Sequence, residues 1–496
     1  MKMTKTLIGL AGSLLAAAAF SGAADAAILE LNGDGSSAGR AVMGYAPVEM
    51  CDVAYNAVTN PITHYHSSQV PAPTDHVWTC KLLSGDDLIV RYHATGSADG
   101  FNHVQSATLQ TLFLNHATST CGAPVHVVAG AREWDDVTCT TVVTIAKNIN
   151  FGASDLRAAS FGQGGPVNFA CPGSGGSPNL IPPGGVAGSC TSPVPVAPGV
   201  ASFAGPVVPF SVIVGNGVQK WDPVANTVIG KAGSLSRDQI ESIFRKEVTD
   251  WKRLGLATAA PCTGVGVPHA GCTGIGIAPA GTAANATAPI DLCLRSAGSG
   301  SKASFQRTLM LLSNETSIGS GASTAGADTF HGKSSNDVIT CLTNNPGGVG
   351  YQDADAVPEF PTVNANPPAY PVKINGFAVS EASYDPGPAT PAASSATVDL
   401  RKLNIRCGAY PFWVTLVITR PTAAFGDARD TAFTAFTTAA AGTTLIDQLK
   451  GNPLVAGQPT AGHFWVAGAQ MTVTKATDRG PMVVTAGNHP ECSVAH

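Results

Sequence analysis

The sequence predicts an α/β fold, because strand-like and helix-like segments alternate along most of its 496 residues. Strand-like runs at 27–31, 87–94 and 289–294 each lead into a turn rich in glycine and serine. In open α/β sheets, ligands bind beyond the carboxyl ends of the strands. We therefore expect these turns to carry the groups that bind a ligand.

The turn after the third of these runs has the chemistry of an anion-binding site. Arg295 is followed by small residues up to Ser301, and a helix-like run follows at 302–312. Glycine lets the backbone approach a ligand, the first N–H groups of a helix point towards it, and a guanidinium offers several donors. Phe305 and Leu309 fall on one face of the helix, which predicts that this face is buried.

The amino-terminal residues indicate export. Lysines at positions 2 and 5 precede an apolar run at 7–20, and residues 24–26 have the small-x-small pattern of a signal peptidase site. We interpret residues 1–26 as a cleaved signal peptide. No later stretch reaches about 18 uninterrupted apolar residues, so we expect a soluble mature protein that is periplasmic or secreted.

The charge pattern excludes one class of partner. Only 12% of the residues are charged and the formal net charge is −5. Nucleic-acid-binding proteins need a basic surface, which this composition does not supply. An anionic ligand would have to be held by local donors, because the overall charge does not attract it.

The cysteines favour disulfides. Twelve follow the signal peptide, and an even number in an exported chain is typical of paired cysteines. Pairing of sequence neighbours is the simplest arrangement, although spacing alone leaves the connectivity open. The sequence contains no Cys-x-x-Cys motif, so neither a zinc site nor a thioredoxin-like site is indicated.

One pair of histidines is a candidate for metal binding. His64 and His66 would lie on the same side of an extended segment. No third ligand accompanies them, so we interpret them as solvated histidines in a loop. We predict no metal and no cofactor for this protein.

Local signals place several further elements. Ser236 and Gln239 form a capping box, which predicts a helix start within 235–244. We expect a buried strand at 206–214, and polar or Gly/Pro-rich loops at 51–80 and 161–205. Further helices are predicted at 101–112, 337–339 and 429–449.

The order of these motifs resembles the phosphate-binding family of ABC-transporter substrate-binding proteins, which have the two-lobed type II periplasmic binding fold. The resemblance implies an α/β lobe 1 from 27–200 and 363–496, an α/β lobe 2 from 205–362, and a ligand cleft between them. The extra length lies in cysteine-bearing loops. The stretches that carry the resemblance are 33–37, 95–97, 152–155, 235–251, 295–301, 347–351 and 408–411.

The resemblance also implies how phosphate is recognised. Arg295 would neutralise the anion, and Asp155 would accept its proton. Sulfate is fully ionised at neutral pH, so it would be disfavoured beside that carboxylate. Ala38 stands where the family usually has an aromatic residue, and Ala297 where an acid accompanies the arginine. The positions implied to contact phosphate are Ser37, Ser97, Asp155, Arg295, Ser299, Gly300 and Ser301.

The implied function is binding without catalysis. A monomer would deliver phosphate or a similar oxyanion to an ABC permease. One alternative is a serine hydrolase, because Ser37 fits a G-x-S-x-G pattern and Ser299 to Lys302 fit S-x-x-K. The other alternative is a disulfide-stapled surface or structural protein that has lost its ligand, which Ala38, Ala297 and the long loops favour.

Overall fold

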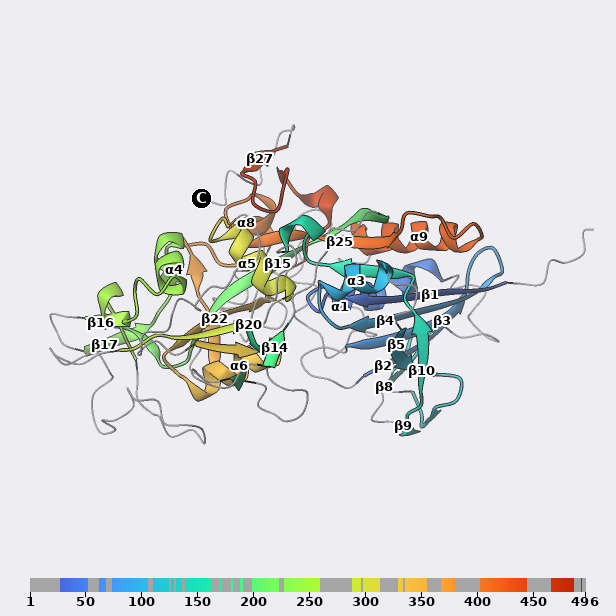
Figure 1. The fold of residues 1–496 in the computed structure, drawn as a ribbon, viewed down its shortest axis with the longest axis horizontal. Coiled ribbons are helices and arrows are strands. Elements are labelled where there is room, and N and C mark those ends of the chain that lie inside the picture. The colour runs from blue at the N-terminus through green and yellow to red at the C-terminus, as the bar shows by residue number, and fades with distance from the viewer. Residues whose placement is uncertain are drawn as a thin grey trace, which may run out of the picture.

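A computed structural model describes the chain from residue 27 onwards and places its strands mainly in one mixed sheet (Figure 1). The predicted signal peptide lies outside the described residues. The structure describes 27–485 and 492 except for 52–61, 68–73, 106–109, 125, 129–130, 136–138, 162–168, 172–179, 182–187, 191–198, 223–226, 259–287, 296–297, 313–328, 333–334, 355–366, 380–401 and 444–464.

The main sheet has 14 strands, and β23 (Ala369–Pro371) pairs with β15 beside the continuous path of the others. In spatial order that path is β13 (Leu180–Ile181), β21 (Thr329–Gly332), β20 (Asp291–Arg295), β22 (Gly348–Asp353), β15 (Val200–Gly215), β25 (Trp413–Pro421), β11 (Phe151–Ser154), β1 (Ile28–Gly35), β4 (Asp87–Ala94), β3 (Asp75–Lys81), β2 (Ile62–His66), β8 (Ala131–Asp135) and β7 (His126–Val128).

The sheet runs through two halves that lie side by side along the long axis (Figure 1). In one half β1 is parallel to β4 and β11, and in the other β20 is parallel to β21 and β22. The antiparallel pair β15 and β25 joins the two groups. The prediction of a mixed α/β fold is confirmed, whereas the division into lobes at 200, 205 and 362 stays a prediction.

Helices cover the sheet, and small separate sheets extend from it (Figure 1). The helices are α1 (Arg40–Tyr45), α3 (Asp99–Gln105), α4 (Arg237–Phe244), α5 (Gly300–Thr308), α6 (Ser335–Asn344), α8 (Leu403–Arg406) and α9 (Arg429–Ala441). The small sheets pair β5 (Gln110–Leu114) with β10 (Thr144–Asn148), β6 (Thr120–Cys121) with β9 (Cys139–Thr141), β12 (Phe169–Cys171) with β14 (Gly188–Cys190), β16 (Val218–Asp222) with β17 (Thr227–Lys231) and β19 (Leu256–Thr258), β18 (Ser234–Leu235) with β24 (Lys373–Ile374), and β26 (Val473–Lys475) with β27 (Met482–Val484).

One sequence signal acts locally as predicted, and one further contact links distant segments. At the start of α4, the Ser236 side chain accepts from Gln239 N–H and the Gln239 side chain accepts from Ser236 N–H, so the capping box is confirmed. The Trp251 indole donates to Gly347 O at 2.6 Å. This bond ties the segment after α4 to the turn that precedes β22.

The central strand β15 is buried along most of its length. It begins at Val200, inside the predicted 161–205 loop, and it is buried from 205 to 215. A strand that is covered on both faces needs a continuous apolar run, which 206–214 supply. The loop prediction was therefore too long at its carboxyl end, because the first residues of β15 are exposed or half-buried and lack that signal.

The predicted helix at 101–112 is wrong in its second half. Helix α3 ends at Gln105, and β5 pairs with β10 from Gln110 onwards. The first turn of α3 lies against the sheet, since a Cβ on Gly100 would be 2.1 Å from Ala153 O. Phe113 is buried in a small cluster with Ile149, so tertiary packing overrides the helix pattern there.

Four of the predicted pairs of neighbouring cysteines are confirmed, and the pair predicted for Cys171 and Cys190 stays a prediction. The described disulfides are Cys51–Cys80, Cys121–Cys139, Cys293–Cys341 and Cys407–Cys492. The pair predicted for Cys262 and Cys272 lies outside the described residues.

The predicted loop at 51–80 contains two strands of the main sheet. His64 lies on β2 and is fully buried, where it stacks on Trp78 and bonds His76 at 3.0 Å between ring nitrogens. The interpretation of His64 as a solvated histidine is therefore wrong, because its ring packs among other rings in the core. Among the described residues, no group of three or more metal-ligating side chains could hold a metal ion.

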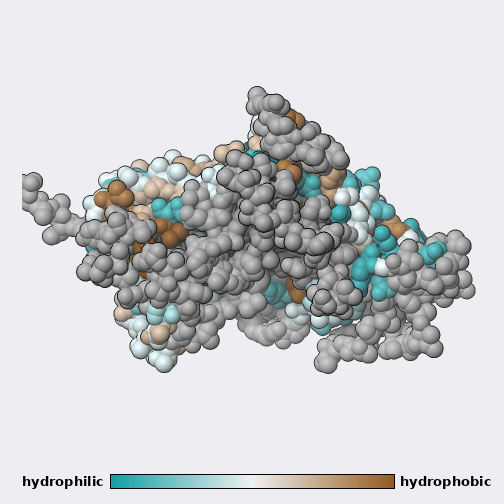
Figure 2. All heavy atoms as spheres, turned by 180° about the vertical axis from the view of Figure 1, so that it is seen from behind, coloured by the Kyte–Doolittle hydropathy of each residue, from teal (hydrophilic) through white to brown (hydrophobic). Residues whose placement is uncertain are grey.

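The surface combines hydrophobic and hydrophilic residues in small patches on the face drawn in Figure 2. The large apolar side chains that are exposed are scattered over distant elements, for example Leu83, Leu112 and Val484. In the part of the chain that the structure describes, no helix is both long enough and apolar enough to cross a membrane.

We expect the buried Cys293–Cys341 disulfide to contribute strongly to stability. It joins β20 to α6 across 48 residues, and both cysteines are fully buried. Loop closure of this length predicts that replacing both cysteines by serine lowers the free energy of unfolding by about 4 kcal/mol. Denaturant unfolding would measure this loss, and an unchanged midpoint would contradict the prediction.

Candidate functional site

Four strands of the main sheet end in polar residues that the fold brings together. Ser36 follows β1 and Asp155 follows β11, which are parallel neighbours in one half. Arg295 ends β20 and Asp353 ends β22, which are parallel neighbours in the other half. All four residues are buried. They form a charged cluster where the two halves meet.

Asp155 is held by two serine hydroxyls of its own half. Ser36 Oγ donates to Asp155 Oδ1 and itself accepts from Gly39 N–H at 2.8 Å. Asp155 N–H donates to Ser97 Oγ at 3.2 Å. These contacts fix the carboxylate at the carboxyl end of the sheet, where the Gly/Ser turns were predicted to bind a ligand.

Asp353 occupies the centre of the second part of the cluster. Ser301 Oγ donates to Asp353 Oδ1 at 2.7 Å, and Ser335 Oγ donates to Asp353 Oδ2 at 3.4 Å. Arg295 Nη1 donates to the same Ser335 Oγ at 2.8 Å. Arg40, from α1 in the other half, places Nη1 3.5 Å from Asp353 Oδ2. Carboxylates and guanidinium groups from both halves therefore share one buried network.

The start of α5 lies directly against Asp155. A Cβ added to Gly300 would be 1.9 Å from Asp155 Oδ2 and 2.1 Å from Ser97 Oγ. Ala98 N–H also donates to Gly298 O at 3.3 Å, which links the Ser97 turn to the turn before α5. Only glycine fits at this close approach, so the identity of residue 300 is set by the contact between the halves.

Burial changes the acidity of the central carboxylate. Loss of water and, to a smaller extent, the negative charge of Asp353 raise the pKa of Asp155 to about 7, although hydrogen bonds from Ser36 and Ser97 and the positive charge of Arg295 oppose the rise. Burial lowers the pKa of Arg295, and Asp353 is the first of the neighbouring charges that oppose this. Asp155 can therefore take up or release a proton near neutral pH.

The structure places the predicted site residues in different ways. Ser97, Asp155 and Gly300 contact one another directly, and Arg295 and Ser301 join them through the Asp353 network. Ser299 caps α5, because its Oγ accepts from Lys302 N–H at 3.5 Å. Ser37 is half-buried, and it is its neighbour Ser36 whose hydroxyl bonds Asp155. The contacts of these residues with a ligand stay a prediction.

Sequence reasoning missed Ser36, Arg40, Ser335 and Asp353. Asp353 gave the same signal as Asp155, since a carboxylate follows a buried glycine-containing strand in both cases. Arg40 gave no signal of its own, because an arginine one residue after a Gly/Ser turn is common on surfaces. Its burial beside Asp353 depends on a contact between residues 313 positions apart.

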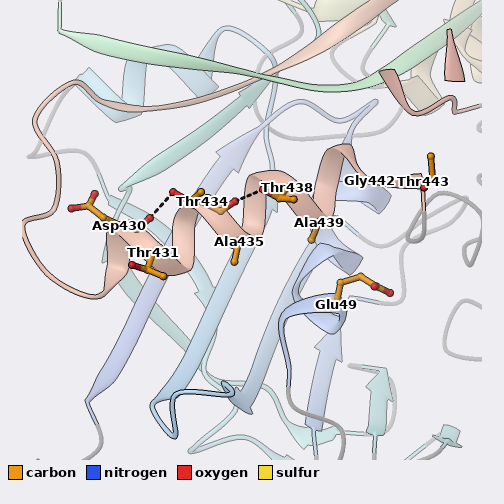
Figure 3. Close-up of a pocket in the computed structure, with 9 residues that line it drawn as sticks. All are labelled: Glu49, Asp430, Thr431, Thr434, Ala435, Thr438, Ala439, Gly442 and Thr443. Carbon is orange, nitrogen blue, oxygen red and sulfur yellow. Dashed lines mark hydrogen bonds between the residues drawn. The ribbon is translucent and has the colours of Figure 1, made fainter. Parts of the chain in front are cut away.

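A separate groove of about 760 Å³ runs along α9 and lies outside this cluster (Figure 3). Two of its threonines bond helix carbonyls, since Thr434 Oγ1 donates to Asp430 O at 2.9 Å and Thr438 Oγ1 donates to Thr434 O at 2.8 Å. These hydroxyl hydrogens are not available to an anion. The residues that line the groove are Glu49, Asp430, Thr431, Thr434, Ala435, Thr438, Ala439, Gly442 and Thr443.

Comparisons with known families and structures found the following similarities. Residues 208–440 match the model of a PBP superfamily domain. Solved structures to which the chain is similar include an ABC-type phosphate transport receptor from Vibrio cholerae (12% identity, TM-score 0.37, 84% of this chain and 97% of that chain). Another is PstS from Borrelia burgdorferi (12% identity, TM-score 0.33, 88% of this chain and 98% of that chain). A third is a phosphate-binding protein from Stenotrophomonas maltophilia (11% identity, TM-score 0.34, 88% of this chain and 90% of that chain). No curated protein matches the sequence.

We expect Gly300→Ala to disrupt the contact between α5 and Asp155. The added methyl group would overlap a carboxylate oxygen and a hydroxyl, and overpacking of this kind costs about 1–3 kcal/mol. Gly468→Ala is the matched control, because nothing lies within 4 Å of its Cβ position. Thermal unfolding of both variants would test this, and equal melting temperatures would contradict it.

We expect Asp155 to make stability depend on pH. Its pKa is raised from 3.8 in the unfolded chain to about 7, so the folded state binds the proton more tightly. The resulting stabilisation is complete below about pH 4 and is lost as the pH rises from there to 7, with a size on the order of 4 kcal/mol. Asp155→Asn should remove this loss. Parallel unfolding curves for both proteins from pH 4 to 8 would contradict the assignment.

Proposed function

Since residues 208–440 carry a PBP superfamily domain, we propose that this protein binds a protonated tetrahedral oxyanion, with phosphate as the ligand, at the charged cluster between its halves. The observation that carries the proposal is the position of Asp155. It is a buried carboxylate that lies within the same network as two arginines and against the first turn of a helix.

The positive groups of the cluster support an anionic ligand. Arg40 and Arg295 are both buried, and a buried guanidinium requires a negative partner. Helix α5 begins at Gly300, so its first backbone N–H groups lie at the same place as these charges. Lys302, in the first turn of α5, is also fully buried. Guanidinium groups and helix N–H groups in one place are the groups that bind oxyanions in proteins.

The carboxylate supports an oxyanion that carries a hydrogen. A fully ionised anion would repel Asp155, whereas a hydrogen phosphate can donate to it. The loss from an unsatisfied buried charge or hydrogen bond is about 1–3 kcal/mol or more, which is enough to separate phosphate from sulfate. The selectivity therefore follows from the number of hydrogens on the ligand.

The cluster favours binding over hydrolysis. Ser299 and Lys302 fit the S-x-x-K pattern, but the Ser299 hydroxyl accepts a backbone hydrogen bond as a helix cap. Ser37, of the G-x-S-x-G pattern, contributes its carbonyl to Arg40 Nη1 at 2.5 Å. These contacts explain both serines as parts of an anion-binding structure.

The transport role extends the proposal beyond the site. The seven motifs occur in the order of the phosphate-binding substrate-binding proteins, and the first 26 residues have the pattern of a signal peptide. We infer an extracytoplasmic monomer that delivers phosphate to an ABC permease.

We expect titration calorimetry to show phosphate binding that sulfate cannot match. The protein would first be unfolded and refolded to remove bound anion. Asp155→Asn and Arg295→Gln should each weaken phosphate binding about 10- to 100-fold, because each removes a charged hydrogen-bonding group worth about 1.5–3 kcal/mol.

Thr438→Val is the matched control for that titration, because it changes the α9 groove and leaves the cluster intact. Its phosphate affinity should equal that of the wild type. Wild-type protein that binds no small oxyanion would overturn the proposal and favour a surface protein on a binding-protein fold.

A further inference from the structure

We propose that Asp353 is the residue that positions Arg295 and requires a second hydrogen on the ligand, so that the site prefers the singly charged dihydrogen form of phosphate. This inference rests on the proposed function, and it assigns the form of the ligand and the residue that selects it. Asp353 is fully buried at the end of β22.

Asp353 provides the carboxylate that the sequence lacks beside Arg295. The resemblance implies an acid two residues after the arginine, but Ala297 stands there. In the fold, Ser335 Oγ accepts from Arg295 Nη1 and donates to Asp353 Oδ2. Asp353 thus reaches the guanidinium through one hydroxyl, from a strand adjacent to β20. This link orients one edge of the guanidinium through its Nη1 group.

The same carboxylate changes what Ser301 can offer a ligand. A serine hydroxyl has one hydrogen, and Ser301 gives its hydrogen to Asp353 Oδ1 at 2.7 Å. Only lone pairs remain for another group. Ser36 is in the same position, because its hydrogen goes to Asp155. Two hydroxyls of the cluster therefore act as acceptors, and a ligand that bonds them must donate.

The charge balance favours a ligand with one negative charge. Asp353 lies 3.5 Å from Arg40 and also acts on Arg295, so much of the positive charge is already compensated. A second ligand charge would face both carboxylates in a buried site. The ionisable groups that act on Asp155 or Asp353 are Arg40 from α1, Tyr92 from β4 and Arg295 from β20, and Asp337 from α6 and Tyr351 from β22 act on Arg295.

The test is calorimetric titration of refolded protein with inorganic phosphate and with sulfate at pH 6 and pH 8. Wild-type protein should bind phosphate about tenfold more tightly at pH 6, where the dihydrogen form dominates. Asp353→Asn should reduce this pH dependence to less than about threefold and lower the preference for phosphate over sulfate at least tenfold. Asp427→Asn is the control, because it removes an exposed carboxylate that pairs with Arg429 outside the cluster and should leave both quantities unchanged.

A second variant keeps the inference testable if Asp353→Asn does not fold. Ser335→Ala removes only the link between Arg295 and Asp353, at a half-buried position. It should weaken phosphate and sulfate about equally, by roughly threefold to tenfold, since a neutral hydrogen bond is worth about 0.5–1.5 kcal/mol.

The outcomes separate the two proposals. Wild-type protein that binds no oxyanion overturns the proposed function and this inference with it. Wild-type protein that binds phosphate, with the same selectivity and pH dependence in Asp353→Asn, overturns the inference alone. Unchanged affinities in Ser335→Ala overturn the positioning role of Asp353.

Discussion

Four buried ionic side chains at the junction of the two halves form the constraint on which the rest of this structure depends. Arg40 and Asp155 come from one half, and Arg295 and Asp353 come from the other. An isolated charge in such a place is expensive, so each group needs partners, which serine hydroxyls of its own half and the Arg40–Asp353 ion pair across the halves supply. The contact between Gly300 and Asp155 brings those partners together. The position of each half is therefore coupled to the charge balance of the other.

The sheet explains how such a cluster can be held in place. β15 and β25 pair with each other, and each also pairs with strands of one of the two halves, so the strand ends that carry Asp155 and Asp353 belong to one hydrogen-bonded framework. The Cys293–Cys341 disulfide fixes β20 against α6, and these two elements carry Arg295 and Ser335. Rigid strands and helices hold buried polar groups at fixed relative positions. The cluster requires this, because its groups have few alternative hydrogen-bond partners.

The hydrogen bonds inside the cluster determine which donors and acceptors it can offer a ligand. Both carboxylates accept from serine hydroxyls, so the network as it stands already satisfies part of each carboxylate. A ligand therefore competes with these serine hydroxyls for the two carboxylates. The number of hydrogens that the ligand can donate determines how well it competes. The α9 groove differs in this respect, because two of its hydroxyls are bound to helix carbonyls and its described lining residues include no lysine or arginine.

Features whose causes are local could be predicted from the sequence. The capping box at Ser236 and the buried run of β15 each depend on residues close together in the chain, and the pairing of neighbouring cysteines followed their order along it. The strand-to-turn patterns marked the turns that contain Ser97 and Gly300, because a Gly/Ser turn after a strand is a local signal, whereas the choice of these residues and of Asp155 came from the family resemblance. The segment at 101–112 failed for the opposite reason, since pairing with β10 decides the conformation of its last residues.

The tertiary structure decided which of these residues share one network. The sequence by itself determined the α/β alternation and the presence of an arginine, a carboxylate and small residues at strand ends. It did not distinguish Ser36 from Ser37, or single out Arg40 and Asp353, because those assignments depend on contacts across 119 and 313 positions. Burial and electrostatic pairing over such separations arise only when the sheet is complete, so no local pattern records them.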